Sequence, residues 1–383
     1  MTTSTDTRNR RRFGVMLAIA GAGTLALAAC GSSSNNSSSS SSSSGGGSAP
    51  GKIALLLPET KTTRYEAADK PYFLQKLKDL GYDTSQVIYS NANQDAALQQ
   101  NQADAAITNG AKVLVLDPVD SKSAASIANK AKQAGIPVIS YDRLITGSTA
   151  VSYYISFDNQ KVGQLQAQAL VDGLTKAGKT DPHIVMINGS PTDNNAHQFK
   201  AGAHSVFDPL VSSGKLHIDK EYDTPDWSPD QAQNEMQQAL TALNNKVDGV
   251  YAANDGTGGG AIAAMKSAGL SPLPPVTGQD AELAGIQRII AGQQYMTVYK
   301  AIKPEASDAA EMAFALASGK SVPGNLAGSK VNNGAIDVPS DILTPVAVTK
   351  DNVKDTVVKD GFHTAAEICT SDYTQFCTQL GIS

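Results

Sequence analysis

The apolar residues of this 383-residue chain follow two alternating patterns. Short β-rich runs such as 53–57 predict buried strands, and stretches with apolar residues three or four apart predict helices. Phe73, Leu77 and Leu80 are spaced in this second way, and Gly81 then ends the helix. Because the alternation continues to residue 318, the pattern is that of an α/β protein built on parallel sheets.

The individual elements follow from this alternation. Predicted strands lie at 53–57, 87–89, 113–116, 136–141, 152–157, 184–188, 215–222, 250–253, 275–278 and 295–298. Predicted helices lie at 70–80, 93–109, 121–135, 158–174, 195–211, 228–243, 258–267, 281–291 and 304–318. Pro71 falls in the first turn of its helix, where a proline is tolerated.

A chain of 383 residues is too long for one ordinary domain, and the pattern restarts after residue 157. We therefore expect two doubly wound parallel-sheet lobes. The first comprises 51–157 plus about 301–325, and the second comprises 158–300 plus about 326–383. The chain should cross back to the first lobe near Ala301. Two such lobes joined by more than one strand form a hinge that a ligand can close.

The first 50 residues have no place in these lobes. Four arginines between Arg8 and Arg12, an apolar run at 13–29 and the sequence Leu-Ala-Ala-Cys ending at Cys30 are typical of a lipoprotein signal peptide at 1–30. An ordinary signal peptide with an incidental Cys30 is the alternative, and the arginines also weakly match a twin-arginine signal. Residues 31–50, mostly Ser, Gly and Asn, predict a flexible tether.

The chain is therefore expected outside the cell, held at the outer face of the cytoplasmic membrane by a lipid on Cys30. With Cys30 acylated, Cys369 and Cys377 are the two remaining cysteines. In an oxidising compartment they predict a local disulfide. A metal site is the less favoured reading, because two thiols without a nearby histidine pair are an incomplete set of ligands.

Polar residues follow several of the predicted strands. Asp142 and Arg143 follow 136–141, GSPTDNNA follows 184–188, NDGTGGG follows 250–253 and QDAE follows 275–278. Open α/β sheets bind their ligands at the carboxyl ends of the strands. We therefore expect these segments to face one cleft, lined by groups that donate and accept hydrogen bonds.

The usual catalytic motifs do not occur in the sequence: GxSxG, HExxH and the P-loop are missing. The glycines at 256 and 258–260 lack the Lys-Ser/Thr of a phosphate loop and are expected to serve a tight start of a helix. The five histidines show no diagnostic spacing to a cysteine or carboxylate. His197 and His204 share one helix face, but two imidazoles alone are more often surface or packing residues than metal ligands. Binding without turnover, with no cofactor and no metal, is the preferred interpretation.

The net charge of −5 argues against a nucleic-acid partner, which would need a concentrated basic face. A small polyhydroxylated ligand suits the cleft better, because each hydroxyl both donates and accepts a hydrogen bond and must be satisfied on burial. Trp227, the single tryptophan, lies between Pro225 and Pro229 and could stack on a sugar face. The alternative is that Trp227 anchors a loop.

The folded part from Lys52 to about His363 resembles the D-xylose-binding proteins of bacterial ABC sugar transporters, within the type I periplasmic-binding-protein superfamily. The matching stretches are YISFDNQKVGQLQAQALVDGL, GSPTDNNA, GQDAELAGI, MTVYK and LTPVAVTKDNVKDTVVKDGFH. The resemblance implies sugar contacts from Arg64, Asp142, Arg143, Asp193, Asn195, Trp227, Asn254, Asp280 and Lys300. Tyr65 takes the place where this family usually has a second stacking tryptophan.

The resemblance also implies the role of each contact. The cationic side chains donate to sugar oxygens, the carboxylates accept from hydroxyls, the amides do both and Trp227 stacks. The implied function is binding of a monosaccharide, D-xylose above all, and its unchanged delivery to the permease subunits of an ABC importer by a monomeric protein. Glucose, galactose or arabinose, or service as a sugar sensor for a receptor, remain open. A repressor would need a helix-turn-helix where the tether lies, and a glycosidase would need an acid/base pair.

Overall fold

We describe the fold from a computed structural model, which covers residues 49–382. The predicted signal peptide, Cys30 and all but the last two residues of the predicted tether lie outside the described residues. Residues 48–383 form one compact unit. None of the described helices is both long enough and apolar enough to cross a bilayer.

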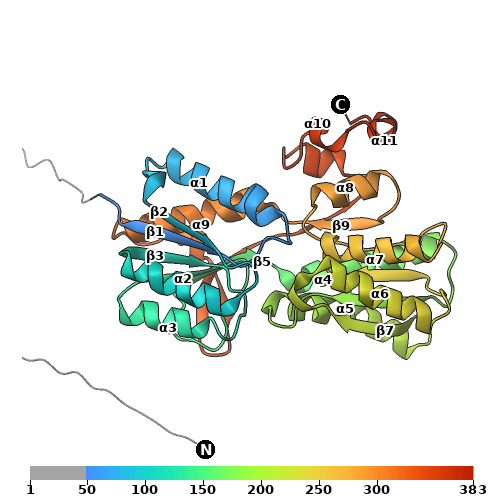
Figure 1. Ribbon diagram of the computed structural model, residues 1–383, viewed down its shortest axis with the longest axis horizontal. Coiled ribbons are helices and arrows are strands. Elements are labelled where there is room, and N and C mark those ends of the chain that lie inside the picture. Colours follow the sequence, from blue (N-terminus) through green and yellow to red (C-terminus); the bar gives the residue numbers. More distant parts are fainter. Residues whose placement is uncertain (1–48, 383) are drawn as a thin grey trace, which may run out of the picture. The chain divides into compact units, whose positions relative to one another are not determined.

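A seven-stranded sheet forms the first lobe, with the strand order β10-β11-β5-β4-β3-β1-β2 (Figure 1). All neighbouring strands pair in parallel except β10 and β11. The strands are β1 (Lys52–Leu57), β2 (Val87–Asn91), β3 (Ala111–Leu116), β4 (Val138–Tyr141), β5 (Tyr153–Phe157), β10 (Ser329–Asn332) and β11 (Asp337–Leu343). The predicted doubly wound α/β lobe is therefore present.

Alternate residues of β1 explain why helices cover both faces of this sheet. Ala54 and Leu56 pack in one apolar cluster with α2 (Ala96–Thr108) and α3 (Ala125–Gln133). Their neighbours in β1 point to the other face and pack with α1 (Lys70–Asp79) and α9 (Ile302–Ala317). A strand that is apolar along its whole length is thus buried on both sides, as parallel sheets require.

The predicted boundary of the second lobe at about 326 is wrong for the segment 329–343. Residues Ser340 to Leu343 of β11 pair in parallel with Tyr154 to Phe157 of β5, and β10 pairs with β11. Both strands therefore extend the first sheet. The segment is mostly polar and contains Gly334 and Pro339, so it lacks the continuous apolar run that predicts a buried strand.

The second lobe contains the parallel sheet β7-β6-β8 and the antiparallel pair β12-β9. These strands are β6 (His183–Asn188), β7 (His217–Asp223), β8 (Gly249–Ala252), β9 (Met296–Tyr299) and β12 (Val346–Thr349). The predicted strand 275–278 is reduced to isolated bridges, Val250 to Val276 and Gln279 to Val298, which link the two groups of strands.

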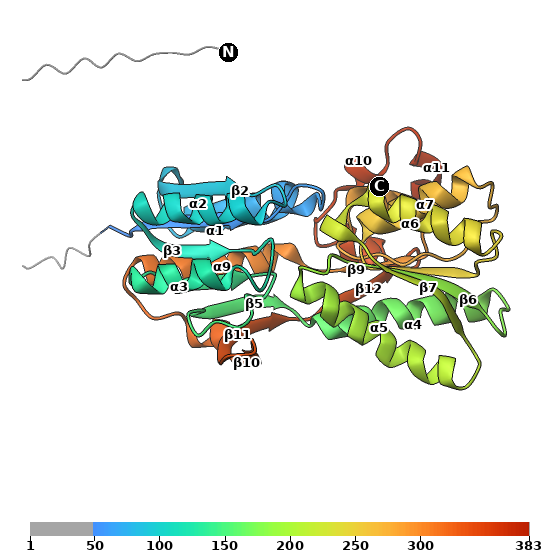
Figure 2. The ribbon, with the colours of Figure 1, turned by 60° about the horizontal axis from the view of Figure 1, so that its bottom comes forward.

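Helices cover both faces of this second group as well (Figure 2). One face carries α4 (Asn159–Lys176) and α5 (Asn194–Ser212), and the other carries α6 (Pro229–Ala242) and α7 (Asp255–Ser267). Gly163 and Gly202 let α4 and α5 touch, since a Cβ on either would overlap a backbone carbonyl of the opposite helix. Gly260 does the same between α7 and α6, so this glycine serves helix packing rather than the start of a helix.

The chain passes between the lobes three times. It leaves β5 for α4, returns from β9 to α9 and leaves β11 for β12. The second passage contains Ala301, the residue at which a return was expected. Three connections at one junction allow the lobes to rotate about a hinge while limiting other movements.

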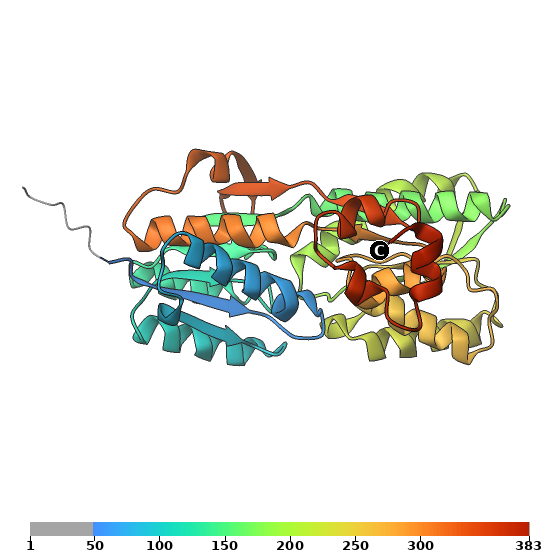
Figure 3. The same ribbon diagram turned by 90° about the horizontal axis from the view of Figure 1, so that it is seen from above.

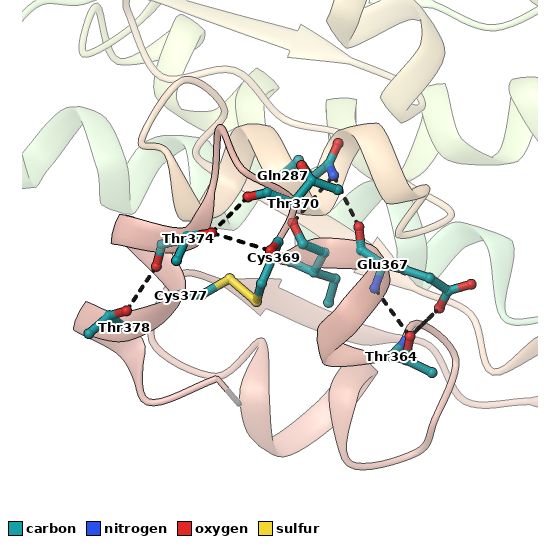
Figure 4. The surroundings of a disulfide bond; sticks show 9 residues. Gln287, Thr364, Glu367, Cys369, Thr370, Thr374, Cys377 and Thr378 are labelled. Carbon is teal, nitrogen blue, oxygen red and sulfur yellow. Dashed lines mark hydrogen bonds between the residues drawn. A yellow bond between two sulfur atoms is a disulfide. The ribbon is translucent and has the colours of Figure 1, made fainter.

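The C-terminal segment packs against α8 (Leu283–Ile290) of the second lobe (Figure 3). It contains α10 (Ala365–Ile368) and α11 (Thr374–Leu380), joined by a disulfide between Cys369 and Cys377 (Figure 4). Cys377 is buried in the same apolar cluster as α8. Gln287 on α8 donates to the backbone carbonyls of Glu367 and Ile368, each at 3.3 Å.

The disulfide closes a loop with a sequence separation of 8, for which loop-closure entropy is on the order of 2 kcal/mol. We expect the double substitution Cys369→Ser and Cys377→Ser to lower the midpoint of thermal unfolding by several degrees, measured by calorimetry. Ser371→Ala, an exposed change inside the same loop, is the control. An unchanged midpoint, with thiol titration showing the bond formed in the parent protein, would contradict this expectation.

Candidate functional site

Strand ends from both lobes converge on one cavity. It is lined by Thr62, Arg64, Tyr65, Asp142, Arg143, Asp193, Asn195, Phe199, Trp227, Asn254, Gln279, Asp280 and Lys300. All ten residues expected at a ligand site are therefore brought together.

Arg64 and Asp142 form the centre of the first-lobe wall. Arg64 Nη2 lies 2.5 Å from Asp142 Oδ2, and Arg64 Nη1 lies 2.7 Å from Asp69 Oδ1. The Tyr65 hydroxyl donates to the same Asp142 oxygen at 3.0 Å. The Tyr65 ring has the guanidinium carbons of Arg64 and Arg143 at 4.5 and 5.6 Å from its centre. Tyr65 therefore orders charged groups within the wall in addition to lining the cavity.

Asp280 and Lys300 bring the second lobe into contact with this pair. Lys300 Nζ lies 3.2 Å from Asp280 Oδ1 and 3.4 Å from Asp142 Oδ1. Arg64 Nε lies 3.3 Å from Asp280 Oδ1. All four side chains are at most 3% exposed. Two cations and two carboxylates thus form a buried network that joins the lobes.

The network keeps Asp142 and Lys300 ionised. Burial alone would raise the pKa of Asp142, but Arg64, Lys300 and Arg143 outweigh burial and hold this pKa well below its usual range. For Lys300, burial and Arg64 act to lower the pKa, yet Asp142 and Asp280 together leave it raised. A charged acceptor and a charged donor therefore face the cavity at neutral pH.

A second pair across the lobes links Arg143 to Asp193. Arg143 Nε lies 3.1 Å from Asp193 Oδ2, and the Trp227 indole N–H donates to the same oxygen at 3.1 Å. The other Asp193 oxygen accepts from the backbone N–H of Asn195 and so caps α5. Both oxygens of Asp193 therefore have partners. Asp193 orients Trp227 and also presents acceptors to the cavity.

Trp227 is buried, with 4% of its surface exposed, and it borders the cavity. Its indole lies where a Cβ on Gly189 would overlap it, so the residue after β6 has to be glycine. Phe199 approaches edge-on, with ring centres 6.2 Å apart. Trp227 thus packs in the apolar cluster of the second lobe while bordering the cavity, so the anchoring and stacking readings are compatible.

Amide side chains supply the remaining polar groups. Asn195 Nδ2 donates to the backbone carbonyl of Asp142 at 2.9 Å, while Asn195 Oδ1 is buried without a protein partner among the described residues. Asn254 Oδ1 accepts from the backbone N–H of Thr257 and caps α7, which leaves its Nδ2 as a donor. Gln279 Oε1 also lacks a partner within residues 49–382.

Unusual backbone conformations occur at three places in the walls. Asp142, Trp227 and Asp280 have positive φ angles of 52°, 53° and 87°. Such conformations are uncommon for residues other than glycine and are concentrated at functional sites. Two of the three are carboxylates near the end of a predicted strand: Asp142 directly follows 136–141, and Asp280 comes two residues after 275–278. Both carboxylates line the cavity.

The sequence prediction missed three residues of the cavity wall, Thr62, Phe199 and Gln279. Two of them left a signal. Phe199 stands four residues after Asn195 on α5 and so shares its face, and Gln279 directly precedes Asp280. The sequence gives no comparable sign for Thr62.

The prediction also missed buried carboxyl groups behind the wall. Asp117 Oδ1 lies 3.6 Å from Arg143 Nε, and Glu305 Oε2 lies 3.8 Å from Arg64 Nη1. Burial raises the pKa of both well above the usual range and raises that of Asp69 to about 6.

Comparison with known proteins identifies the family. A model described as a periplasmic binding protein domain matches residues 53–321, well over half of the chain. The chain belongs to the periplasmic binding protein family. This assignment confirms the fold class inferred from the sequence, and the two-lobed arrangement of the strands agrees with it.

Individual relatives of this periplasmic binding protein are sugar-binding proteins. It is 43% identical to the D-xylose-binding periplasmic protein of Escherichia coli over 83% of this chain and 92% of the relative. It is 37% identical to the multiple sugar-binding periplasmic receptor ChvE of Rhizobium radiobacter over 83% and 92%. The resemblance to xylose-binding proteins stated from the sequence is thereby confirmed.

Solved structures of sugar-binding proteins also resemble this chain. An ABC transporter solute-binding protein from Clostridium phytofermentans with bound β-D-glucose superposes with a TM-score of 0.76, at 32% identity, over 82% of this chain and 99% of that structure. A carbohydrate transporter solute-binding protein from Chloroflexus aurantiacus in complex with D-glucose gives a TM-score of 0.75 at 33% identity, over 82% and 97%.

A further contact between the lobes lies at the edge of the cavity of this periplasmic binding protein. Glu282 Oε1 accepts from the backbone N–H of Thr63 at 2.9 Å. The backbone N–H of Glu282 in turn donates to Asp255 Oδ2 at 2.8 Å. Burial, helped by Asp255 and Asp280, raises the pKa of Glu282 to about 8. Burial likewise raises the pKa of Asp255 to about 7.

These raised pKa values predict a stability that falls as the pH rises. Between about pH 4.5 and pH 8 the folded protein keeps protons on Glu282 and Asp255 that the unfolded chain has lost. Glu282→Gln keeps an acceptor for Thr63 but cannot ionise. We expect it to reduce the decline in the free energy of unfolding between pH 5 and pH 8 by at least about 1 kcal/mol, measured by denaturant titration.

Glu311→Gln is the matched control, because Glu311 is a partly exposed carboxylate paired with Lys76 on the surface of the first lobe. The free energy of unfolding of Glu311→Gln should change with pH as that of the parent protein does. If Glu282→Gln also showed the parent slope, Glu282 would not be the group that holds the proton.

Proposed function

We propose that this chain is the extracytoplasmic solute-binding protein of an ABC importer. It binds one monosaccharide, D-xylose, in the cleft between the lobes and passes it chemically unchanged to the permease subunits. The observation that carries the proposal is the cavity in which ionised donors and acceptors from both lobes meet beside a tryptophan. In this account the protein acts as a monomer and needs no cofactor.

The chemistry of the walls supports an uncharged polyhydroxylated ligand. Cations and carboxylates alternate around the cavity and already neutralise one another in pairs, so a ligand with net charge would leave one member uncompensated. Sugar hydroxyls donate to carboxylates and accept from ammonium or guanidinium groups at the same time. Trp227 supplies a flat apolar surface for the C–H face of a sugar ring.

The xylose assignment rests on the relatives. D-xylose-binding proteins of Escherichia coli and Haemophilus influenzae are 43% and 40% identical to this chain. A site fitted to a pentose would exclude the additional hydroxymethyl group of a hexose. Binding of several sugars, glucose, galactose or arabinose among them, is the second candidate, favoured by ChvE and by the two glucose-bound structures. The third candidate function is that of a sugar sensor for a receptor, which would use the same binding chemistry.

Sugar hydrolysis is disfavoured by the same ion pairs. A glycosidase needs one carboxylic acid with a raised pKa at the scissile bond. The pKa of Asp142 is held low, and Asp280 contacts both Arg64 and Lys300. Burial raises the pKa of Asp193, but Arg143, the Trp227 indole N–H and the backbone N–H of Asn195 already engage its oxygens. The relatives and structural neighbours are binding proteins of transport systems, which agrees with a protein that is not an enzyme.

We further propose that a lipid on Cys30 anchors the protein at the membrane, with residues 31–50 as a tether. One acyl-bearing cysteine at the N-terminus and a long polar linker would keep the sugar site near the permease. Cys30→Ser should move the protein from the membrane fraction to the soluble fraction of the cells that produce it. Retention of this variant in the membrane fraction would exclude the anchor.

The function is tested by calorimetric titration of the chain from Ser48 to Ser383 with D-xylose, L-arabinose, D-glucose, D-galactose and D-ribose. We expect D-xylose to bind tightest, with one sugar per chain. Because Trp227 is the only tryptophan, a change in its fluorescence on adding sugar reports contact at the cavity directly. Tighter binding of a hexose would favour the second candidate, and no binding of any sugar would refute the proposal.

Trp227→Ala and Trp227→Phe separate stacking from hydrogen bonding. The alanine variant should weaken sugar binding by on the order of 1 kcal/mol or more, about five- to tenfold. The phenylalanine variant keeps an aromatic face and loses only the indole donor to Asp193, so it should retain more of the affinity. Equal affinity of the parent and the alanine variant would remove Trp227 from the binding site.

A further inference from the structure

Two histidines and two aspartates meet at the starts of two neighbouring strands, far from the cavity. His183 is the first residue of β6, with Asp181 two residues before it, and His217 is the first residue of β7. His183 lies opposite His217 in the parallel pairing of β6 with β7. The pairing register shifts after Ile184, which leaves Asp219 of β7 without a partner residue in β6. Asp181 contacts His217 and Asp219 contacts His183, so all four side chains come together.

The contacts within this group are close. The His183 and His217 rings stack with centres 4.6 Å apart and planes inclined by 14°. His217 Nε2 lies 2.7 Å from Asp181 Oδ1, and His183 Nδ1 lies 2.9 Å from Asp219 Oδ2. One donor atom from each of Asp181, His183 and His217 lies within 4.8 Å of the others. Among the described residues, no second group of three potential ligands satisfies this criterion.

This ligand set has the chemistry of a site for a divalent transition metal ion. Two imidazoles and a carboxylate are the donors that zinc takes in sites with one open position. Tetrahedral zinc separates such donors by about 3.4 Å, so donor atoms that lie within 4.8 Å of one another would have to move closer together to share one ion. With neutral imidazoles the two aspartates contribute a charge of −2, which one divalent ion neutralises.

The surroundings of these three candidate ligands also fit a metal site. Asp219 accepts from His183 Nδ1–H and so fixes the ring and its tautomer, as carboxylates do behind metal-bound histidines. The other His183 nitrogen remains for the metal. The side chains of His183 and His217 are 44% and 42% exposed, so an ion reaches them from solvent without unfolding of the lobe.

We propose that Asp181, His183 and His217 form a surface binding site for one Zn²⁺ or a similar divalent transition ion, with Asp219 orienting His183. The site lies at the starts of β6 and β7, whereas the cavity lies beyond the opposite end of β6. β6 has six residues and so separates the two by about 20 Å. Metal binding and sugar binding should therefore be independent. The inference does not rest on the proposed sugar function.

Calorimetric titration of the untagged chain from Ser48 to Ser383 with ZnCl₂ tests the site. We expect one ion per chain, with affinity reduced at least tenfold in His183→Ala and in His217→Ala. Asp219→Asn, which alters only the orienting group, should reduce affinity by about tenfold. In each variant, retention of the parent's circular dichroism and thermal midpoint without metal shows that the fold is intact.

His204→Ala is the matched control, because His204 is also partly exposed and contacts two carboxylates, Asp208 and Glu221. It should bind Zn²⁺ as the parent does. The proposal is overturned if the parent shows no zinc binding below millimolar concentration. It is equally overturned if His204→Ala abolishes binding while His183→Ala and His217→Ala leave it unchanged.

Discussion

Ionised side chains withdrawn from water at the junction of the two lobes are stable only when each has a partner of opposite charge. Arg64, Asp142, Asp280 and Lys300 form such a set, and Arg143 with Asp193 forms another. In each set the partners come from different lobes. Removal of one member would leave an uncompensated buried charge, at a cost of about 3–5 kcal/mol. The relative position of the two lobes therefore depends on the charged side chains that face the cavity.

The fold delivers these charges by the geometry of parallel strands. The parallel strands of a sheet end at the same edge, so the polar residues that follow β6 and β8 gather at one edge of the second sheet. Across the cavity from them lie the residues that follow β4 of the first sheet. Left-handed turns at Asp142 and Asp280 then aim two carboxylates inward. Gly189 leaves room for Trp227, and Asp255 holds the backbone at Glu282, two residues after Asp280. The groups that line the cavity are thus positioned by residues that do not line it themselves.

Much of this arrangement could be predicted from the sequence, because it depends on local patterns. The alternation of apolar runs predicted the strands and helices, and abrupt polar ends of strands predicted Asp142, Arg143 and Asp280. The placement of 329–343 was wrong, since a mostly polar segment leaves a weak signal. The buried carboxyls Asp117 and Glu305 were missed, because nothing in their neighbours in sequence indicates that distant arginines compensate them. The meeting of His183 with His217 depends on strand register, which the sequence pattern did not specify.

In the proposed function, the paired charges of both lobes hold one sugar between them. A crystal structure of the chain with bound D-xylose tests this arrangement. We expect sugar hydroxyls within hydrogen-bonding distance of Asp142, Asp280, Lys300 and an arginine, with the ring against Trp227. A sugar bound outside this cavity, or contacted by the residues of one lobe alone, would contradict it.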